Sequence, residues 1–325
     1  MVVRLLEKQI ILVCFFKSLF FTKGVKLKAE VVKFNATDGT TLNGLIFNYK
    51  EEKDKVIIST HGMGSNCFKP RDLEIANLIE GTNISLFTYN NRGTEIISKM
   101  KRKVDGEEES FLAGAADEDV LEGYFDVKGA IEKAAQLGYK KIYLQGHSLG
   151  STKTVYTYNK LKEEGYEHLD LIKGVILLSL VDIPQAIIDI WNLSDEQVES
   201  LISLSRKMIE DGRGMELMPE GVFVQPVSAK EFVRLCVDNE ETNFARYHDK
   251  DYKYEKINNI DKPLFMRWGN NRELISQNAD ELVQMLNEKI INTDKDINYI
   301  DGADHSFHGY ENILAKQIVD FVNRF

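Results

Sequence analysis

Short apolar runs alternate with longer amphipathic stretches along most of the chain. Several runs, such as KVIIST at 55–60 and GVILLSL at 174–180, are nearly continuous in apolar residues. A strand that is buried on both faces of a parallel sheet has this pattern, whereas a strand with one wet face alternates. The pattern predicts strands at residues 29–35, 41–49, 55–60, 84–89, 141–145, 174–180, 263–268 and 297–300.

The stretches between these runs have the spacing of helices. Residues 119–137 carry apolar side chains on one helical face and end at Gly138. Ser194 and Gln197 form a capping-box pattern for a helix that runs to Gly212. A last helix is expected near residues 310–325, and the charged residues 99–110 indicate a loop. Alternating strands and helices predict an α/β protein with a mostly parallel sheet covered on both faces.

The strand pattern is interrupted once. Residues 183–262 contain helical and irregular stretches, and the strand signal returns only afterwards. This arrangement predicts a cap inserted into one core domain, formed by residues 25–182 and 263–325. Residues 1–24 have a basic start and a broken apolar run, which is too short to span a bilayer and lacks a clear cleavage site. They are expected to be an extension without order, with a signal or membrane tether as the alternative.

Composition and charge narrow the possible partners. The formal net charge is -10, so no basic surface is expected for nucleic acid or for an anionic membrane. The cysteines are few and far apart, which argues against a disulfide framework and favours a reducing, cytoplasmic location over secretion. These cysteines are Cys14, Cys67 and Cys236.

A candidate nucleophile follows one of the predicted strands. The strand KIYLQ at 141–145 runs into GHSLG, and a helix-compatible stretch comes next. In the pattern G-x-S-x-G, a strained turn lifts the serine above the sheet, and the glycines leave room for the turn. Ser148 is therefore the candidate nucleophile, although a serine here could also simply cap the next helix.

A serine hydroxyl needs a base and an oxyanion hole to act as a nucleophile. His305, just beyond the last strand, is the candidate base, with His308 as the second choice. The N–H groups of Leu149, after the serine, and of Met63, in the glycine-rich loop after residues 55–60, are the candidate oxyanion donors. His61 and His147 belong to the glycine-rich loop and the serine turn, and no constellation is evident around His168 and His248. No metal-binding spacing is present, so no metal and no cofactor are expected.

These motifs resemble those of the α/β-hydrolase superfamily. The segments HGMGSN at 61–66, YNNRG at 89–93, GHSLG at 146–150 and GADHSF at 302–307 each follow a predicted strand and keep the superfamily's order of serine, acid and histidine. The resemblance covers residues 25–325 and implies a core sheet of about eight strands under a cap. EDGRGMELMP at 210–219 and VSA at 227–229 are also similar to a branch named DUF1749, in which some fungal members cleave ester-linked siderophores.

Two positions depart from the superfamily pattern. Many relatives have an aspartate where Asn90 stands, in a loop that shapes the site. Relatives also place the triad acid about three residues after the glycine that ends the strand at 263–268, where this chain has Arg272, and a guanidinium cannot accept a hydrogen bond. Glu273, the nearest carboxylate and one place later, is the favoured candidate for the acid; Asp182 after the strand at 174–180 and Asn271 as a neutral substitute are the alternatives.

The sequence thus favours a serine hydrolase that cleaves a carboxylic ester, or a thioester or amide, of a small molecule through an acyl-enzyme. The alternative is a binding protein that keeps the fold without catalysis, because a fold alone does not establish activity. The substrate and the oligomeric state are not indicated by the sequence.

Overall fold

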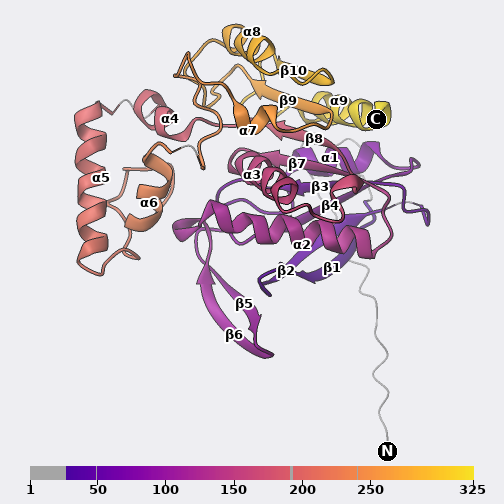
Figure 1. The fold of residues 1–325 in the computed structure, drawn as a ribbon, viewed down its shortest axis with the longest axis horizontal. Coiled ribbons are helices and arrows are strands. Elements are labelled where there is room, and N and C mark those ends of the chain that lie inside the picture. Colours follow the sequence, from indigo (N-terminus) through magenta and orange to yellow (C-terminus); the bar gives the residue numbers. More distant parts are fainter. Residues whose placement is uncertain (1–26, 49, 191–192, 240) are drawn as a thin grey trace, which may run out of the picture.

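The computed structural model describes residues 27–48, 50–190, 193–239 and 241–325, and it centres on one eight-stranded sheet (Figure 1). The strand order is β1-β2-β4-β3-β7-β8-β9-β10; β1 pairs antiparallel with β2 and β2 with β4, and the other neighbours are parallel. The strands are β1 (Glu30–Asn35), β2 (Thr41–Phe47), β3 (Lys55–Thr60), β4 (Ile84–Asn90), β7 (Lys141–His147), β8 (Ile172–Leu178), β9 (Leu264–Gly269) and β10 (Lys295–Ile300). The predicted mostly parallel sheet and its strands are confirmed.

Helices cover both faces of the sheet and build two hydrophobic cores. On one face, α2 (Gly123–Gln136), α3 (Leu149–Glu163) and α8 (Ala279–Lys289) pack against the sheet through residues such as Val127, Val155 and Leu282. On the other face, α1 (Pro70–Leu78) and α9 (Glu311–Arg324) pack together through residues such as Ile75 and Leu314. Strands β3, β7, β8 and β9 lie between these layers, which explains their continuous apolar runs.

The helices between β8 and β9 form a group beside the sheet (Figure 1). They are α4 (Ile183–Ile190), α5 (Asp195–Glu210), α6 (Ala229–Cys236) and the short α7 (Glu255–Asn258). The capping box of Ser194 and Gln197 is formed at the start of α5. Side chains of α4, α5 and α6 make a third apolar cluster. Leu149, the residue after Ser148, belongs to this cluster, and the Met63 side chain packs against it. The division of the chain at residues 183 and 262 stays a prediction.

The prediction of a loop at residues 99–110 is wrong, because the chain forms a projecting hairpin there (Figure 1). Strands β5 (Ser98–Val104) and β6 (Glu107–Ala113) are antiparallel and turn through Asp105 and Gly106, both with positive φ. Opposite charges face each other across the strands, as in the 2.5 Å contact of Lys101 Nζ with Glu108 Oε1. The Asp-Gly pair between segments of opposite charge was the available signal for a hairpin.

Residues 1–24, for which an extension or tether was expected, lie outside the described residues. Within the described part of the chain, no helix is both long and apolar enough to span a bilayer.

Candidate functional site

Ser148 stands on a strained turn between β7 and α3. Its φ of 55° and ψ of -127° are rare for a residue with a side chain, and the two nearby glycines leave room for them. A Cβ at Gly146 would lie 2.3 Å from the Gly150 carbonyl oxygen, and a Cβ at Gly150 would lie 2.2 Å from the Thr60 carbonyl oxygen. The turn is therefore possible only with glycine at both positions, as the sequence motif predicts.

His305 and Glu273 come together at the same edge of the sheet. His305 lies in the loop after β10, Glu273 lies in the loop after β9, and His305 Nδ1 donates a hydrogen bond to Glu273 Oε1. The Glu273 side chain is 1% exposed and the His305 side chain 20%. The imidazole is thus oriented by a buried carboxylate while its own edge stays open.

Further hydrogen bonds hold the Glu273 carboxylate in place. Its Oε2 accepts from Ser179 Oγ at 2.7 Å and from the Gly269 N–H at 3.0 Å, and its Oε1 accepts from the Leu274 N–H at 2.9 Å. Burial alone would raise the pKa of this carboxyl, but the charge of His305 and these hydrogen bonds outweigh burial and lower it. Glu273 is therefore held in its ionised form.

His147 ties the His305 loop to the serine turn. Its Nε2 lies 2.7 Å from the His305 carbonyl oxygen, so this nitrogen carries the proton, and the two rings are 5.0 Å apart between centroids. Burial lowers the pKa of His147 well below its usual value, which keeps the ring neutral. Because His147 directly precedes Ser148, this contact joins the His305 loop to the serine turn. Among the described residues no hydrogen bond joins Ser148 Oγ to His305, and such bonds often tighten only when substrate binds.

The loop after β3 lies directly against the serine turn. A Cβ at Gly62 would be 2.9 Å from both the Ser148 Cβ and the His147 carbonyl oxygen, and 3.4 Å from the Leu149 nitrogen. Within the described chain, neither the Met63 N–H nor the Leu149 N–H donates to a backbone carbonyl. Both donors are thus free to face a substrate oxygen near Ser148.

His61 fixes the orientation of that loop. Its Nδ1 donates to the Gly62 carbonyl at 2.8 Å, and its Nε2 accepts from the Asn91 N–H at 3.1 Å. The Gly62 carbonyl and the Met63 N–H belong to one planar trans peptide group and point in opposite directions. By holding the carbonyl, His61 turns the Met63 N–H away from itself. Burial, followed by the charge of Lys153, lowers the pKa of His61 to about 3.

The loop YNNRG at 89–93 is held in place by an ion-pair network. Arg92 is buried and binds Asp126 at 2.8 Å, Asp38 at 2.9 Å and Glu122 at 2.8 Å. Burial opposes the charge of Arg92, but Asp126 and then Asp38 outweigh burial and raise the pKa of Arg92. The departure at Asn90 concerns a structural contact, because the Asn90 side chain accepts a hydrogen bond from the Cys67 N–H at 2.8 Å.

The other candidates for the triad acid have different partners. Asp182 is buried, and its oxygens bind His248 Nδ1 at 2.5 Å and Asn243 Nδ2 at 2.8 Å. Asn271 is exposed and bonds to the Ala303 carbonyl through its N–H at 2.9 Å. The expectation of no constellation around His248 was wrong, since Asp182 reaches it from 66 residues away. His308 is also directed elsewhere, to Asp304 at 2.7 Å.

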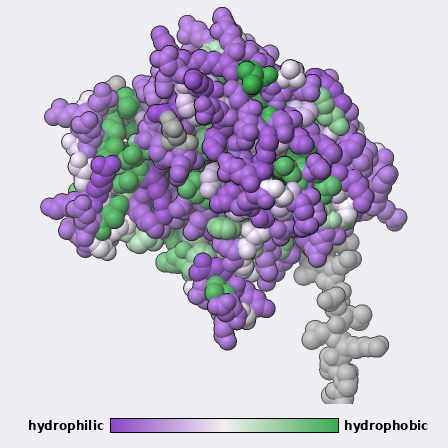
Figure 2. Space-filling model, viewed as in Figure 1, coloured by the Kyte–Doolittle hydropathy of each residue, from purple (hydrophilic) through white to green (hydrophobic). Residues whose placement is uncertain are grey.

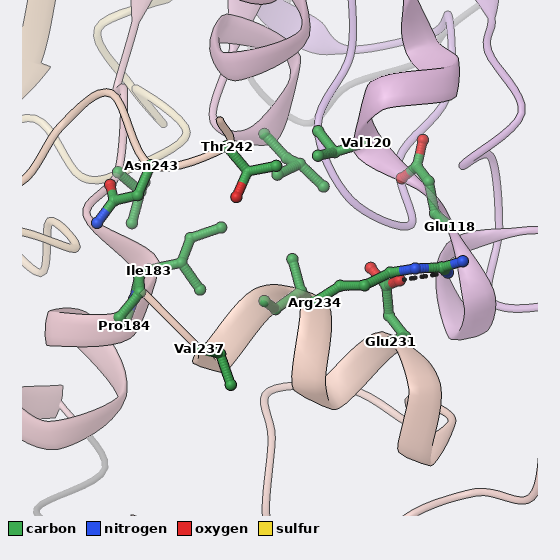
Figure 3. A pocket seen from close by; sticks show the side chains of 12 residues that line it. Glu118, Val120, Ile183, Pro184, Glu231, Arg234, Val237, Thr242 and Asn243 are labelled. Carbon is green, nitrogen blue, oxygen red and sulfur yellow. Dashed lines mark hydrogen bonds and ion pairs between the residues drawn. The ribbon is translucent and has the colours of Figure 1, made fainter. Parts of the chain in front are cut away.

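A narrow cleft that is open to solvent is lined by side chains of α3, α4 and α6 and of the neighbouring loops (Figure 3). Leu149, the residue after Ser148, lines it, so the cleft reaches the serine turn. Its wall also carries the buried Glu118 and Glu231, which the sequence analysis did not single out because they stand far apart in the chain. In the described part of the chain, no cluster of three or more metal-ligating side chains occurs.

Comparison with solved structures finds proteins of the same fold. The siderophore hydrolase EstB from Aspergillus fumigatus is 16% identical with a TM-score of 0.62, covering 94% of this chain and 99% of that one. Est1E from Butyrivibrio proteoclasticus, with ferulic acid bound, is 13% identical with a TM-score of 0.59, covering 90% and 98%. Monoglyceride lipase from Saccharomyces cerevisiae, in complex with a substrate analogue, is 13% identical with a TM-score of 0.58, covering 90% and 94%.

The comparison with curated proteins gives no match. The sequence profile of the family described as "Protein of unknown function (DUF1749)" matches residues 116–325, a stretch that includes Ser148, Glu273 and His305. This chain therefore belongs to the DUF1749 family and has the α/β-hydrolase fold.

Proposed function

We propose that this protein is a serine hydrolase that cleaves a carboxylic ester of a small molecule. The observation that carries the proposal is the hydrogen bond between His305 and the buried Glu273, on the sheet edge where Ser148 stands on its strained turn. The enzymes of similar structure named above include a siderophore hydrolase and a lipase, which supports acyl transfer on an ester.

In the proposed reaction, His305 takes the proton of Ser148 Oγ as the oxygen attacks the ester carbonyl. Glu273 stabilises the imidazolium that forms. The N–H groups of Met63 and Leu149 donate hydrogen bonds to the developing oxyanion. Such donors contribute most at this point, because the negative charge develops in the transition state. His305 then protonates the departing alcohol, and water activated by the same ring releases the acid from Ser148. The same residues would serve for a thioester or an amide.

The test uses a fluorophosphonate probe and a short-chain p-nitrophenyl ester. We expect the wild-type protein to be labelled and to hydrolyse the ester, and the Ser148→Ala variant to do neither. The Ser151→Ala variant is the matched control, because Ser151 stands three residues later on the same helix and bonds to the Leu178 carbonyl. A folded wild-type protein that is neither labelled nor active would instead support a non-catalytic binding protein.

A further inference from the structure

Glu231 of α6 is a buried carboxylate with an unsatisfied oxygen. Its relative exposure is 0%, and within the described chain its Oε1 is buried without a hydrogen-bond partner. Such an oxygen costs free energy unless something binds it. Glu231 lines the cleft that reaches Leu149, so a ligand in the cleft can supply the missing donor.

The nearest cation does not neutralise Glu231 by itself. Arg234 Nη1 is 3.4 Å from Glu231 Oε2, but it is also 3.2 Å from Asp117 Oδ1, and Arg234 Nη2 is 3.5 Å from Asp119 Oδ2. One guanidinium is therefore shared among three carboxylates. Figure 3 shows Arg234 extended beside Glu231 on one side of the cleft.

Glu118 adds a second buried carboxylate to the same side (Figure 3). It forms an ion pair with Lys153 in which both side chains are 0% exposed, so this pair leaves no positive charge for Glu231. Burial and then the charge of Glu118 raise the pKa of Glu231 well above its usual value. The wall of the cleft thus carries Glu118 and Glu231 with one cation, Arg234, which also pairs with Asp117 and Asp119 behind the wall.

The opposite side of the cleft is mostly apolar, although Asn243 also lies there (Figure 3). Ile183, Pro184 and Val237 lie across from the charged group in Figure 3. A ligand with an apolar stem and a cationic, hydrogen-bond-donating end matches both sides. From the shared guanidinium and the unpartnered oxygen, we infer that Glu231, beside Glu118, binds an ammonium or guanidinium group of the substrate, so that the substrates are cationic esters.

The ester part of this inference rests on the proposed function, whereas binding of the cation does not. The first experiment therefore measures binding by calorimetry to the full-length Ser148→Ala protein, with n-hexylammonium and 1-hexanol as probes. We expect n-hexylammonium to bind at least about tenfold more tightly, as for a hydrogen bond to a charged group. Glu231→Gln in the same protein should remove that difference and leave 1-hexanol binding unchanged.

The matched control is Glu199→Gln on the exposed face of α5, which should change neither affinity. Thermal unfolding checks that each variant is folded. If Glu231→Gln does not fold, Glu231→Met replaces it with the same expectation, because an apolar side chain of similar size often substitutes for a buried charge without loss. Equal affinity for the two probes, or a preference that survives in the Glu231 variants, would overturn the inference.

A second experiment compares the p-nitrophenyl esters of ω-aminoalkanoic acids with those of alkanoic acids of matched length, from four to eight carbons. We expect a lower KM for the amino esters at one or more lengths, and we expect Glu231→Gln to raise that KM about tenfold while kcat changes little. Ser148-dependent turnover without any preference for amino esters would refute the inference and leave the proposed function standing. No turnover of either series would refute the proposed function, and the binding experiment would still decide the inference.

Discussion

His305 Nδ1 donates its proton to Glu273 Oε1, although Glu273 stands one position later than the usual place of the acid. Arg272, at the usual place, has a φ of 55° in the left-handed region. This turn brings the next residue back so that the Gly269 N–H bonds to Glu273 Oε2. The additional methylene of glutamate then spans the remaining distance to the imidazole.

The first prediction concerns the identity of the acid. We expect Glu273→Gln to lower kcat by about 10³ to 10⁴, because a neutral amide does not stabilise the imidazolium and can hold the ring in the wrong tautomer. Asp182→Asn should lower kcat far less, since Asp182 is bonded to His248. Steady-state kinetics on a p-nitrophenyl ester measures both, and full activity of Glu273→Gln together with loss in Asp182→Asn would reverse the assignment.

The lowered pKa of Glu273 also predicts how stability depends on pH. The ordinary value for a glutamate is 4.5, and the folded protein holds this group below it. A carboxyl with a depressed pKa in the folded state binds protons more weakly there than in the unfolded state. Its contribution to the stability of the folded protein is therefore complete above the pKa of the unfolded state, and it is lost as the pH falls through the pKa of the folded state. The difference in unfolding free energy between wild type and Glu273→Gln should therefore shrink as the pH falls below about 4.5. Urea unfolding across that range measures the difference, and one that grows on acidification would contradict the prediction.

Much of the fold could be predicted because its signals are local. Buried parallel strands have continuous apolar runs, and the elbow at Ser148 requires glycines at fixed spacing, so both are visible in the sequence. The resemblance to a known superfamily added the expectation of a core sheet of about eight strands, and the sheet has eight. The hairpin of β5 and β6 was missed because its charged residues were given more weight than the turn at Asp105 and Gly106.

The remaining features depend on contacts between distant segments. Asp182 and His248 are 66 residues apart, and Glu118 and Glu231 are also far apart in the chain although both line one cleft. No periodicity or spacing reveals that such residues meet. Glu273 was favoured from the sequence as the nearest carboxylate, but the backbone turn at Arg272 that brings it to His305 is not visible in a sequence pattern.

A further prediction concerns the contribution of Arg92 to stability. Arg92→Met should destabilise the protein by about 3 to 5 kcal/mol, because it leaves the fully buried Asp126 without its cation. Arg92→Lys should cost less, since it keeps the charge and loses only the geometry of the guanidinium, whose Nε and Nη2 both bind Asp126 Oδ1. Urea unfolding of both variants gives the comparison. Equal stability of Arg92→Met and wild type would show that the network contributes nothing net.

The last prediction concerns His61, which holds the Gly62 carbonyl and thereby directs the Met63 N–H. His61→Gln should lower kcat by about tenfold to a hundredfold with little change in KM, because the oxyanion acquires its charge only in the transition state. With a pKa of about 3, His61 stays neutral at ordinary pH, so the ratio of wild-type to variant kcat should be the same from about pH 5 to pH 9. Kinetics across this range measures the ratio, with His248→Gln as a control that leaves kcat within about twofold. A ratio that varied with pH would mean that His61 exchanges a proton during turnover. The role of His61 would then be proton transfer, and not only the positioning of the oxyanion loop.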